Sequence, residues 1–282
     1  MYLSEGALQL KLVHTHKAPF SMRTHLLHLA NAGYLLALGL STPLAVAETI
    51  TIRADSWCPF NCVPQSTKPG YMIEIASAAL GKAGHKVDYQ NLNWSRALAA
   101  ARDGGFTAVV GASDEEVREN KLIVGAAPLG RSINCFVTHK DGSWQYKGLP
   151  SLAGRTIGAI QDYAYGDTLD AYFKANPKVL QAVTGDDALL RNLEKLRNKR
   201  LDAVVEDQAV LAYTINEKNW QGHYKDAGCE RSVTPSGLHI AFSPKHPKAR
   251  EYARLLQDEV AAMRTDGRLK ALLAKYGVPD WQ

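Results

Sequence analysis

Beyond residue 47 the sequence lacks long apolar runs, blocks of like charge and low-complexity tracts. No stretch there reaches the roughly 20 apolar residues of a membrane-spanning helix. The charge balance is mild, with 33 Lys and Arg against 28 Asp and Glu. So small an excess argues against nucleic acid or an anionic membrane as a partner. We therefore expect an ordered soluble protein, long enough for one large domain or two lobes.

Recognisable catalytic and metal-binding motifs are also missing. The chain has no Gly-x-Ser-x-Gly elbow, no phosphate-cradling glycine loop and no His-Glu-x-x-His motif. His139 and His239 stand apart from the paired Cys and His spacing of a zinc site. We expect no metal, no cofactor and no enzymatic activity. An enzyme would need a general acid or base in a cleft, for which Glu206 or Asp207 would be the candidates.

The first 47 residues have the pattern of a signal peptide. A short apolar stretch at 32–40 follows basic residues, and Ala45-Val46-Ala47 provides the small residues that signal peptidase reads. Cleavage after Ala47 would place the mature protein in the periplasm. Met22 begins a signal of ordinary length, so residues 1–21 are expected to be a start-site artefact. The alternative is a retained signal anchor.

Cysteine is scarce, with only four in the chain. In an exported protein, cysteines are more often paired in disulfides than free. Four cysteines allow three pairings. The simplest is local, between Cys58 and Cys62 of a tight CPFNC loop, which leaves Cys135 to pair with Cys229.

A repeated pattern indicates how the chain is organised. The run FTAVVG at 106–111 returns as LDAVVE at 201–206, each time behind an amphipathic helix. A helix followed by a short apolar strand is half of a βαβ unit. The repeat favours two α/β lobes of similar build, and the alternative is two unrelated units in one domain.

Polar side chains follow both repeated strands, where ligands bind in open α/β sheets. The first strand leads into Gly111, Ser113 and Arg118, and the second leads into Glu206 and Asp207. One lobe would thus present a cation and the other an anion. Such a cleft suits a small zwitterion.

Periodicity and turn residues predict the remaining elements. We expect one lobe at 48–131 plus 236–282 and the other at 132–235, joined by two crossings that act as a hinge. The expected strands are 49–54, 87–91, 107–110, 132–139, 156–160, 203–205 and 237–243. The expected helices are 71–83, 96–102 with Ser95 as N-cap, 114–120, 168–175, 188–196, 249–265 and 269–276.

The order of motifs resembles a known family, the periplasmic solute-binding proteins of ABC importers, of the polar amino-acid type (family 3). The resemblance covers nearly all of the chain after residue 47. The motifs are Trp57-Cys58-Pro59-Phe60, Gly70-Tyr71-Met72-Ile73-Glu74, Trp94-x-Arg96-Ala97-Leu98, Ser151-Leu152-Ala153-Gly154-Arg155, Leu201-Asp202-Ala203-Val204-Val205-x-Asp207 and Asp266-Gly267 with Tyr276-Gly277. The fold implied is α/β and two-lobed (type II), each lobe a βα sandwich, with two hinge strands.

The resemblance also implies roles for particular residues. Arg118 would grip a ligand carboxylate with help from Ser113, and Asp207 would receive the ammonium. Trp57 would cover the ligand, and Trp94 would form a pocket wall. Simpler interpretations need no ligand. Arg118 would be a solvated charge on a helix, Asp207 would be a helix N-cap, and Trp94 would pack in the core.

Two departures from the family pattern concern the expected pocket. Glu115-Glu116-Val117 precedes Arg118, where the family usually has Thr-x-x-Arg. Tyr163-Ala164-Tyr165 replaces a Gly-Thr-Thr-like turn, and these phenols would hydrogen-bond a ligand or wedge the turn.

The expected function is to bind an amino acid or related carboxylate and deliver it, as a monomer, to an ABC permease. The alternatives are an exported dehydratase-like enzyme and a ligand-sensing module.

Overall fold

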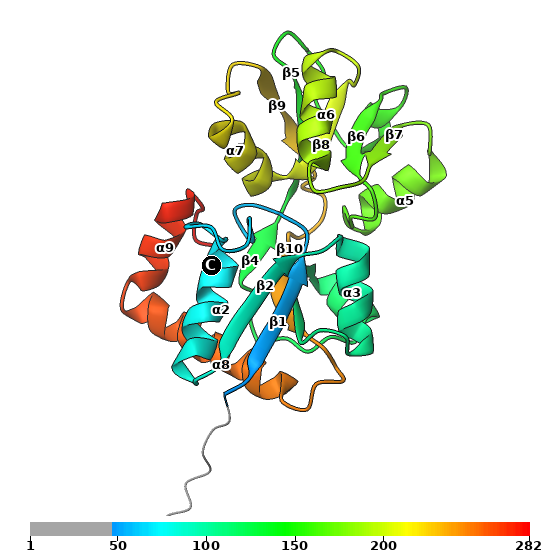
Figure 1. The fold of residues 1–282 in the computed structure, drawn as a ribbon. Helices are drawn as coiled ribbons and strands as arrows, with labels where there is room; N and C mark the ends of the chain where they lie inside the picture. Colours follow the sequence, from blue (N-terminus) through cyan, green and yellow to red (C-terminus); the bar gives the residue numbers. More distant parts are fainter. Residues whose placement is uncertain (1–46) are drawn as a thin grey trace, which may run out of the picture. The chain divides into compact units, whose positions relative to one another are not determined.

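The computed structural model describes residues 47–282, so residues 1–46 of the predicted signal segment at 1–47 lie outside the described residues. The described chain forms two five-stranded sheets (Figure 1). The first sheet has the order β2-β1-β3-β10-β4 and the second the order β7-β6-β8-β5-β9. We call the part built on the first sheet lobe 1 and the part built on the second lobe 2. The α/β, two-sheet prediction is confirmed.

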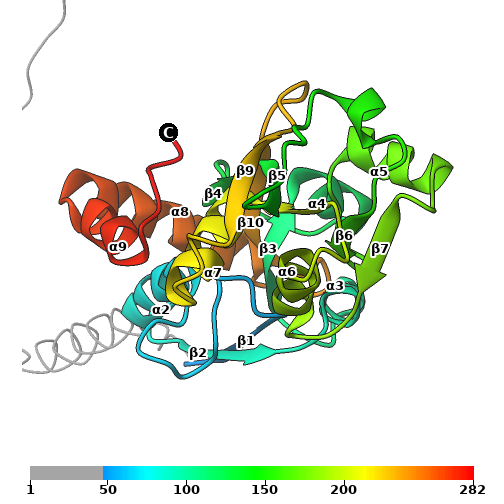
Figure 2. The same cartoon turned by 90° about the horizontal axis from the view of Figure 1, so that it is seen from above.

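In each sheet three strands run parallel, the fourth is antiparallel to them, and the fifth is antiparallel to the fourth. In lobe 1, β1 pairs in parallel with β2 and β3, and β10 is antiparallel to β3 and β4. In lobe 2, β6 pairs in parallel with β7 and β8, and β5 is antiparallel to β8 and β9. Figure 2 shows β9 beside β5 and β7 beside β6. The strands of lobe 1 are β1 (Thr49–Ala54), β2 (Lys86–Asn91), β3 (Ala108–Ser113), β4 (Gly130–Ser132) and β10 (Ser236–Phe242). The strands of lobe 2 are β5 (Asn134–His139), β6 (Ile157–Ile160), β7 (Leu180–Val183), β8 (Ala203–Asp207) and β9 (Tyr224–Cys229).

The two repeated sequence runs become β3 and β8, which hold the same third place in their sheets. Each is preceded by a helix and followed by another, so the repeat reflects one strand–helix plan used twice. The helices of lobe 1 are α2 (Tyr71–Lys82), α3 (Trp94–Asp103), α4 (Asp114–Glu119), α8 (Ala249–Thr265) and α9 (Arg268–Tyr276). Lobe 2 has the 3-10 turn η1 (Leu149–Leu152) and the helices α5 (Asp167–Ala175), α6 (Ala188–Arg197) and α7 (Gln208–Glu217).

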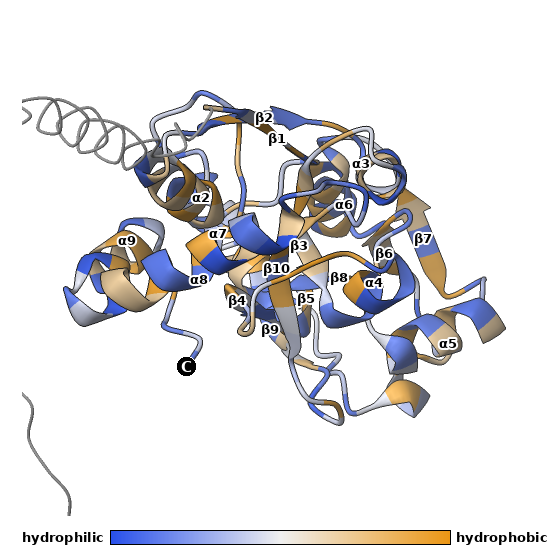
Figure 3. Cartoon of the chain, turned by 90° about the horizontal axis from the view of Figure 1, so that it is seen from below, coloured by the Kyte–Doolittle hydropathy of each residue, from blue (hydrophilic) through white to orange (hydrophobic). Residues whose placement is uncertain are grey.

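Amphipathic helices cover the sheets. Apolar and polar residues alternate along α8 and α9 (Figure 3), and α8 packs against α2 and β10. The apolar faces of these helices close a core with Ile50 and Ile52 of β1, which are fully buried. Burial of an apolar face against the rest of the protein is what stabilises most surface helices. None of the helices within residues 47–282 is long and apolar enough to cross a membrane.

Most predicted elements appear with ends shifted by one to three residues, and one predicted cap is wrong. The N-cap of α3 is Asn93, whose side chain accepts a hydrogen bond from the Arg96 N–H, so the helix begins at Trp94. Ser95 lies inside the helix, and its hydroxyl contacts Asp162 of lobe 2 instead. The predicted strand at 132–139 divides into β4 and β5, which lie in different sheets.

The chain passes between the two sheets twice. Only Ile133 separates β4 from β5, while residues 230–235 connect β9 to β10. The predicted boundaries of the lobes, between residues 131 and 132 and between residues 235 and 236, stay a prediction.

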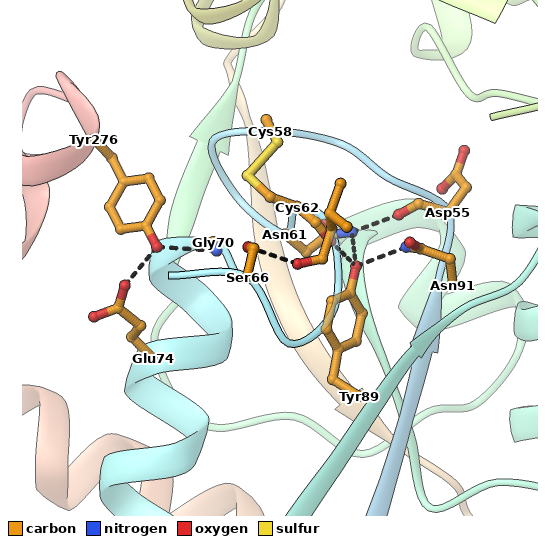
Figure 4. Close-up of a disulfide and its surroundings, with 11 residues drawn as sticks. Asp55, Cys58, Asn61, Cys62, Ser66, Gly70, Glu74, Tyr89, Asn91 and Tyr276 are labelled. Carbon is orange, nitrogen blue, oxygen red and sulfur yellow. Dashed lines mark hydrogen bonds between the residues drawn. A yellow bond between two sulfur atoms is a disulfide. The ribbon is translucent and has the colours of Figure 1, made fainter. Parts of the chain in front are cut away.

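Both expected disulfides form. Cys58 bonds Cys62 in the loop after β1, and Cys135 bonds Cys229. The second pair joins β5 to β9, where the two cysteines face each other in the strand register. Figure 4 shows the first disulfide beside Asn61 and Tyr89, whose polar atoms tie the loop to β2.

Candidate functional site

A cavity of about 120 Å³ lies between residues of the two lobes. Lobe 1 contributes the ends of β1 and β3 and the first turn of α4. Lobe 2 contributes the turn after β6 and the end of β8, and both chain crossings complete the wall. The lining includes Asp55, Trp57, Asn61, Trp94, Gly111, Ser113, Glu115, Glu116, Ser132, Asn134, Tyr163, Tyr165, Glu206, Glu230 and Ser236. The cavity thus lies at the carboxyl ends of the parallel strands, where the sequence predicts the ligand-binding site.

Glu206 lies at the end of β8 and is only 1% exposed. Its Oε1 accepts hydrogen bonds from the indole Nε1 of Trp57 at 3.0 Å and from the backbone N–H of Asp207 at 2.8 Å. Its Oε2 is buried and has no hydrogen-bond partner. Burial, together with the nearby Asp207 and Asp55 carboxyls, raises the pKa of Glu206 from 4.5 to about 8.

Trp57 and Tyr163 contact each other across the cavity from different lobes. Their rings meet edge to face, with centroids 6.4 Å apart. The Tyr163 hydroxyl donates a hydrogen bond to the carboxylate of Asp55 in lobe 1. Burial raises the pKa of Asp55 to about 6, although the Tyr163 hydrogen bond acts in the opposite direction. The lobes are therefore joined by side-chain hydrogen bonds around the cavity.

Gly111 lies against the Trp57 ring near the end of β3, and its backbone conformation favours glycine. Its φ of 92° is in the left-handed region, and a Cβ there would meet Cε3 of Trp57 at 3.4 Å. The same Cβ would lie 3.5 Å from Oδ1 of Asn61, a residue that is fully buried. The Asn61 Nδ2 donates to the Asp55 carbonyl and the Tyr89 hydroxyl, while its Oδ1 has no partner.

The first turn of α4 presents carboxylates to the cavity. Ser113 and Glu116 form a reciprocal capping box, and Oε1 of Glu116 also accepts a hydrogen bond from Nε1 of Trp94 at 2.8 Å. Burial and the neighbouring Asp167 carboxyl raise the pKa of Glu115 from 4.5 to about 7. Asp167 opens α5 in lobe 2, so two carboxyls of opposite lobes face each other here.

Six of the residues predicted from the sequence line the cavity, namely Trp57, Trp94, Gly111, Ser113, Tyr163 and Tyr165. Arg118 and Asp207 are not part of the wall. Their expected pairing across a ligand stays a prediction, and the structure places both side chains elsewhere.

Asp207 is the N-cap of α7 and anchors the first chain crossing. Its Oδ1 accepts from the N–H groups of Ala209 and Val210 at the start of α7. Its Oδ2 accepts from the Ser132 hydroxyl and the Ile133 N–H at the first chain crossing. Because four donors already occupy the carboxylate, the simpler N-cap reading describes it in this structure.

Arg118 lies on the exposed face of α4. Its Nη1 donates to the backbone carbonyl of Asp114 at 3.5 Å. The Asp114 carboxylate instead accepts from the Gly237 N–H and contacts Nε2 of His239. Helix α4 is tied to β10 in this way, with Glu115 and Glu116 rather than Arg118 at the cavity.

Sequence reasoning missed several lining residues, notably Asp55, Asn61, Glu115 and Glu230. Asp55 directly follows β1, so its place at a strand end was an available signal. The acidic run before Arg118 departs from the family pattern, but the direction of its side chains depends on how α4 packs against β10. Asn61 and Glu230 lie in irregular segments with no periodicity to orient them.

Two comparisons place the chain among known proteins. The model of the bacterial extracellular solute-binding proteins, family 3, matches residues 50–279. A substrate-binding protein of an ABC uptake transporter from Streptococcus pneumoniae, solved with bound histidine, is 20% identical with a TM-score of 0.64, covering 81% of this chain and 92% of that one.

Other similar structures have different roles. A histidine kinase sensor domain is 21% identical with a TM-score of 0.65, covering 81% of this chain and 95% of that one. An ancestral amino-acid-binding protein, a precursor of cyclohexadienyl dehydratase, is 19% identical with a TM-score of 0.62. The match covers 81% of this chain and 95% of that one. At such identities the likeness establishes the shared two-lobed fold alone.

Proposed function

Because this chain belongs to the bacterial extracellular solute-binding proteins of family 3, we propose that it binds a small polar solute between its lobes and delivers it to an ABC importer. The observation that carries the proposal is the cavity walled by both lobes and both chain crossings. A ligand held by both lobes favours the closed arrangement by its higher affinity for that state.

The contacts between the lobes suit reversible closure. The Trp57–Glu206 and Ser95–Asp162 hydrogen bonds and the Tyr163–Asp55 contact all involve side chains. Backbone continuity is confined to the two crossings. Val210 of α7 also packs into the core of lobe 1. Opening would therefore break a few side-chain hydrogen bonds and these apolar contacts while both sheets remain intact.

The ligand would be an amino acid or a related polar solute, and the protein would act as a monomer with a membrane permease. Its family and disulfides agree with a periplasmic or secreted protein. Export would follow cleavage after Ala47. Intact-mass measurement of exported material tests this step, and an uncleaved cytoplasmic product would contradict it.

Thermal-shift screening of the purified protein against amino acids, amines and organic acids tests solute binding. A ligand at a hundred times its Kd should stabilise the native state by about 2.7 kcal/mol. A solute that passes this screen should also quench or shift the fluorescence of Trp57 and Trp94. Stimulation of a reconstituted permease's ATPase by the loaded protein tests delivery, and no binding in any class would contradict the proposal.

A second candidate is an exported dehydratase-like enzyme, favoured by Glu206. A carboxyl with a pKa of about 8 is protonated near neutral pH and can act as a general acid. Nuclear magnetic resonance of a bound solute incubated with wild type and with Glu206→Gln tests this candidate. Turnover by the wild type alone, with binding preserved in the variant, would favour the enzyme.

A further inference from the structure

We propose that the cavity binds the cationic end of a small organic amine or guanidine and has no cationic side chain to pair with the carboxylate of an amino acid. This inference rests on the proposed solute-binding function and narrows its ligand class. The ligand preferred by this site would be an amine without an α-carboxylate.

Two buried acceptors without partners point to a donor-rich ligand. Oε2 of Glu206 and Oδ1 of Asn61 have no hydrogen-bond partner, and both residues line the cavity. Buried polar atoms in native structures are nearly always hydrogen-bonded, so two unpaired oxygens at one cavity indicate missing partners. For Asn61, and for Glu206 in its ionised form, these partners must be donors. Ammonium and guanidinium groups are donors only and carry several N–H bonds.

The charge of the wall has one sign. Among the described residues that line the cavity are five carboxyl side chains and no Lys, Arg or His. The carboxyls are those of Asp55, Glu115, Glu116, Glu206 and Glu230. A ligand carboxylate placed here would be repelled from several sides, while a cation would be attracted.

Helix α4 also offers no substitute for a cationic side chain. The N-terminus of a helix attracts anions through its free N–H groups and its dipole. Here the first turn already holds Asp114, Glu115 and Glu116, and the Asp114 N–H donates to Ser236. The chain's own carboxylates thus occupy the position at which a ligand carboxylate would otherwise be stabilised.

Aromatic rings complete the expected environment for a cation. Trp57, Trp94, Tyr163 and Tyr165 all line the cavity. The negative face of an aromatic ring attracts ammonium and guanidinium groups, and Trp gives the strongest interaction. Carboxylates combined with rings form a wall typical of amine recognition.

The dimensions favour a small organic cation over a metal ion. Within residues 47–282, no three His, Cys, Asp or Glu side chains converge in a metal-binding arrangement. The carboxyls are instead spread around a cavity of about 120 Å³. That volume is close to the roughly 150 Å³ of a cavity that accepts benzene.

Calorimetric titration with matched ligand pairs tests the inference. Agmatine and arginine share a guanidinium and differ by a carboxylate, and cadaverine and lysine form the equivalent pair for an ammonium. The amine of at least one pair should bind at least about tenfold more tightly than its amino acid, because the carboxylate has no cationic partner in the wall and is repelled by the carboxyls there.

Glu206→Gln tests the site itself. Gln keeps the shape and the acceptor for Trp57 but removes the charge, so amine affinity should fall by about tenfold or more. Glu119→Gln is the matched control, because Glu119 lies exposed on α4 and is not part of the cavity wall. Amine affinity should change less than about twofold in the control.

The outcomes separate this inference from the broader function. Equal or tighter binding of the amino acids would overturn the inference and leave solute binding intact. Binding only of neutral or anionic solutes would do the same, as would an amine affinity that Glu206→Gln leaves unchanged. Failure of every solute class would overturn both proposals.

Discussion

Glu206 places both of its hydrogen bonds on one carboxyl oxygen and leaves the other buried without a partner. A protonated carboxyl is the less costly form in such surroundings, because no charge must be desolvated. The charged or titratable groups that act on it are Asp55 after β1, Asp207 on β8, and Tyr163 and Tyr165 after β6.

The stability of the protein should therefore depend on pH through Glu206. The unfolded chain loses this proton near pH 4.5, whereas the folded protein holds it to about 8. Between these values the unfolded state binds fewer protons, so the free energy of unfolding falls as pH rises. Urea denaturation across this range should show wild type losing stability relative to Glu206→Gln. Parallel curves for the two proteins would contradict the assignment, and Glu119→Gln should follow wild type.

Ligand affinity should have the opposite pH dependence if the ligand is an amine. A cation pairs with ionised Glu206, so binding must release the proton that the empty site holds. Affinity should rise toward about pH 8, by at most about tenfold per pH unit for one group. Titration in buffers of different ionisation enthalpy would measure the protons released. Fewer should be released by Glu206→Gln, in which Asp55 and Glu115 are the remaining cavity carboxyls with a raised pKa.

At the scale of elements, Asp207 couples the start of α7 to the first chain crossing. Asp207→Ala would leave the N–H groups of Ala209 and Ile133 without their acceptor. We expect the free energy of unfolding to fall by about 2 kcal/mol or more, from the lost cap and the unpaired donors. Urea denaturation measures the loss, with the exposed neighbour Gln208→Ala as control. A stable variant that fails to bind solute would instead support the ligand role predicted from the family.

The β8 strand shows how far sequence can locate a site. The sequence repeat predicts shorter strands with polar residues after them, and in the structure Ser113 ends β3 while Glu206 and Asp207 end β8. Glu206 and Asp207 are adjacent in a strand, so their side chains point to opposite faces. Pattern alone leaves open which one meets the ligand, because that choice depends on how the sheet faces the other lobe.

Local competition explains other differences from the sequence predictions. Asn93 and Ser95 are both good cap residues, and the chain uses Asn93, which frees Ser95 for a contact with lobe 2.

The elements β7, β9 and α7 were not predicted. Strand β9 reads YKDAGC, which has too few apolar residues for a clear alternating pattern. Its place beside β5 is set by tertiary pairing.

For the whole molecule, the two disulfides should differ in their effect on stability. They close loops of very different length, with sequence separations of 4 and 94 residues. In the chain-entropy model the short loop contributes about 2 kcal/mol and the long one about 4 to 5 kcal/mol. Denaturation of the double alanine variants should rank Cys135 with Cys229 as the more destabilising pair. The reverse order would show that strain or residual unfolded structure dominates.

The strand order also determines when each sheet can be completed during synthesis. Strand β10 lies between β3 and β4, yet it follows all of lobe 2 in the chain. Lobe 2 is one continuous segment, whereas lobe 1 must wait for residues 236–242 and the helices behind them. We expect nascent chains arrested before residue 236 to protect β5–β9 from protease while β1–β3 remain sensitive. The part of the protein that is made first would then be the last to reach its final structure.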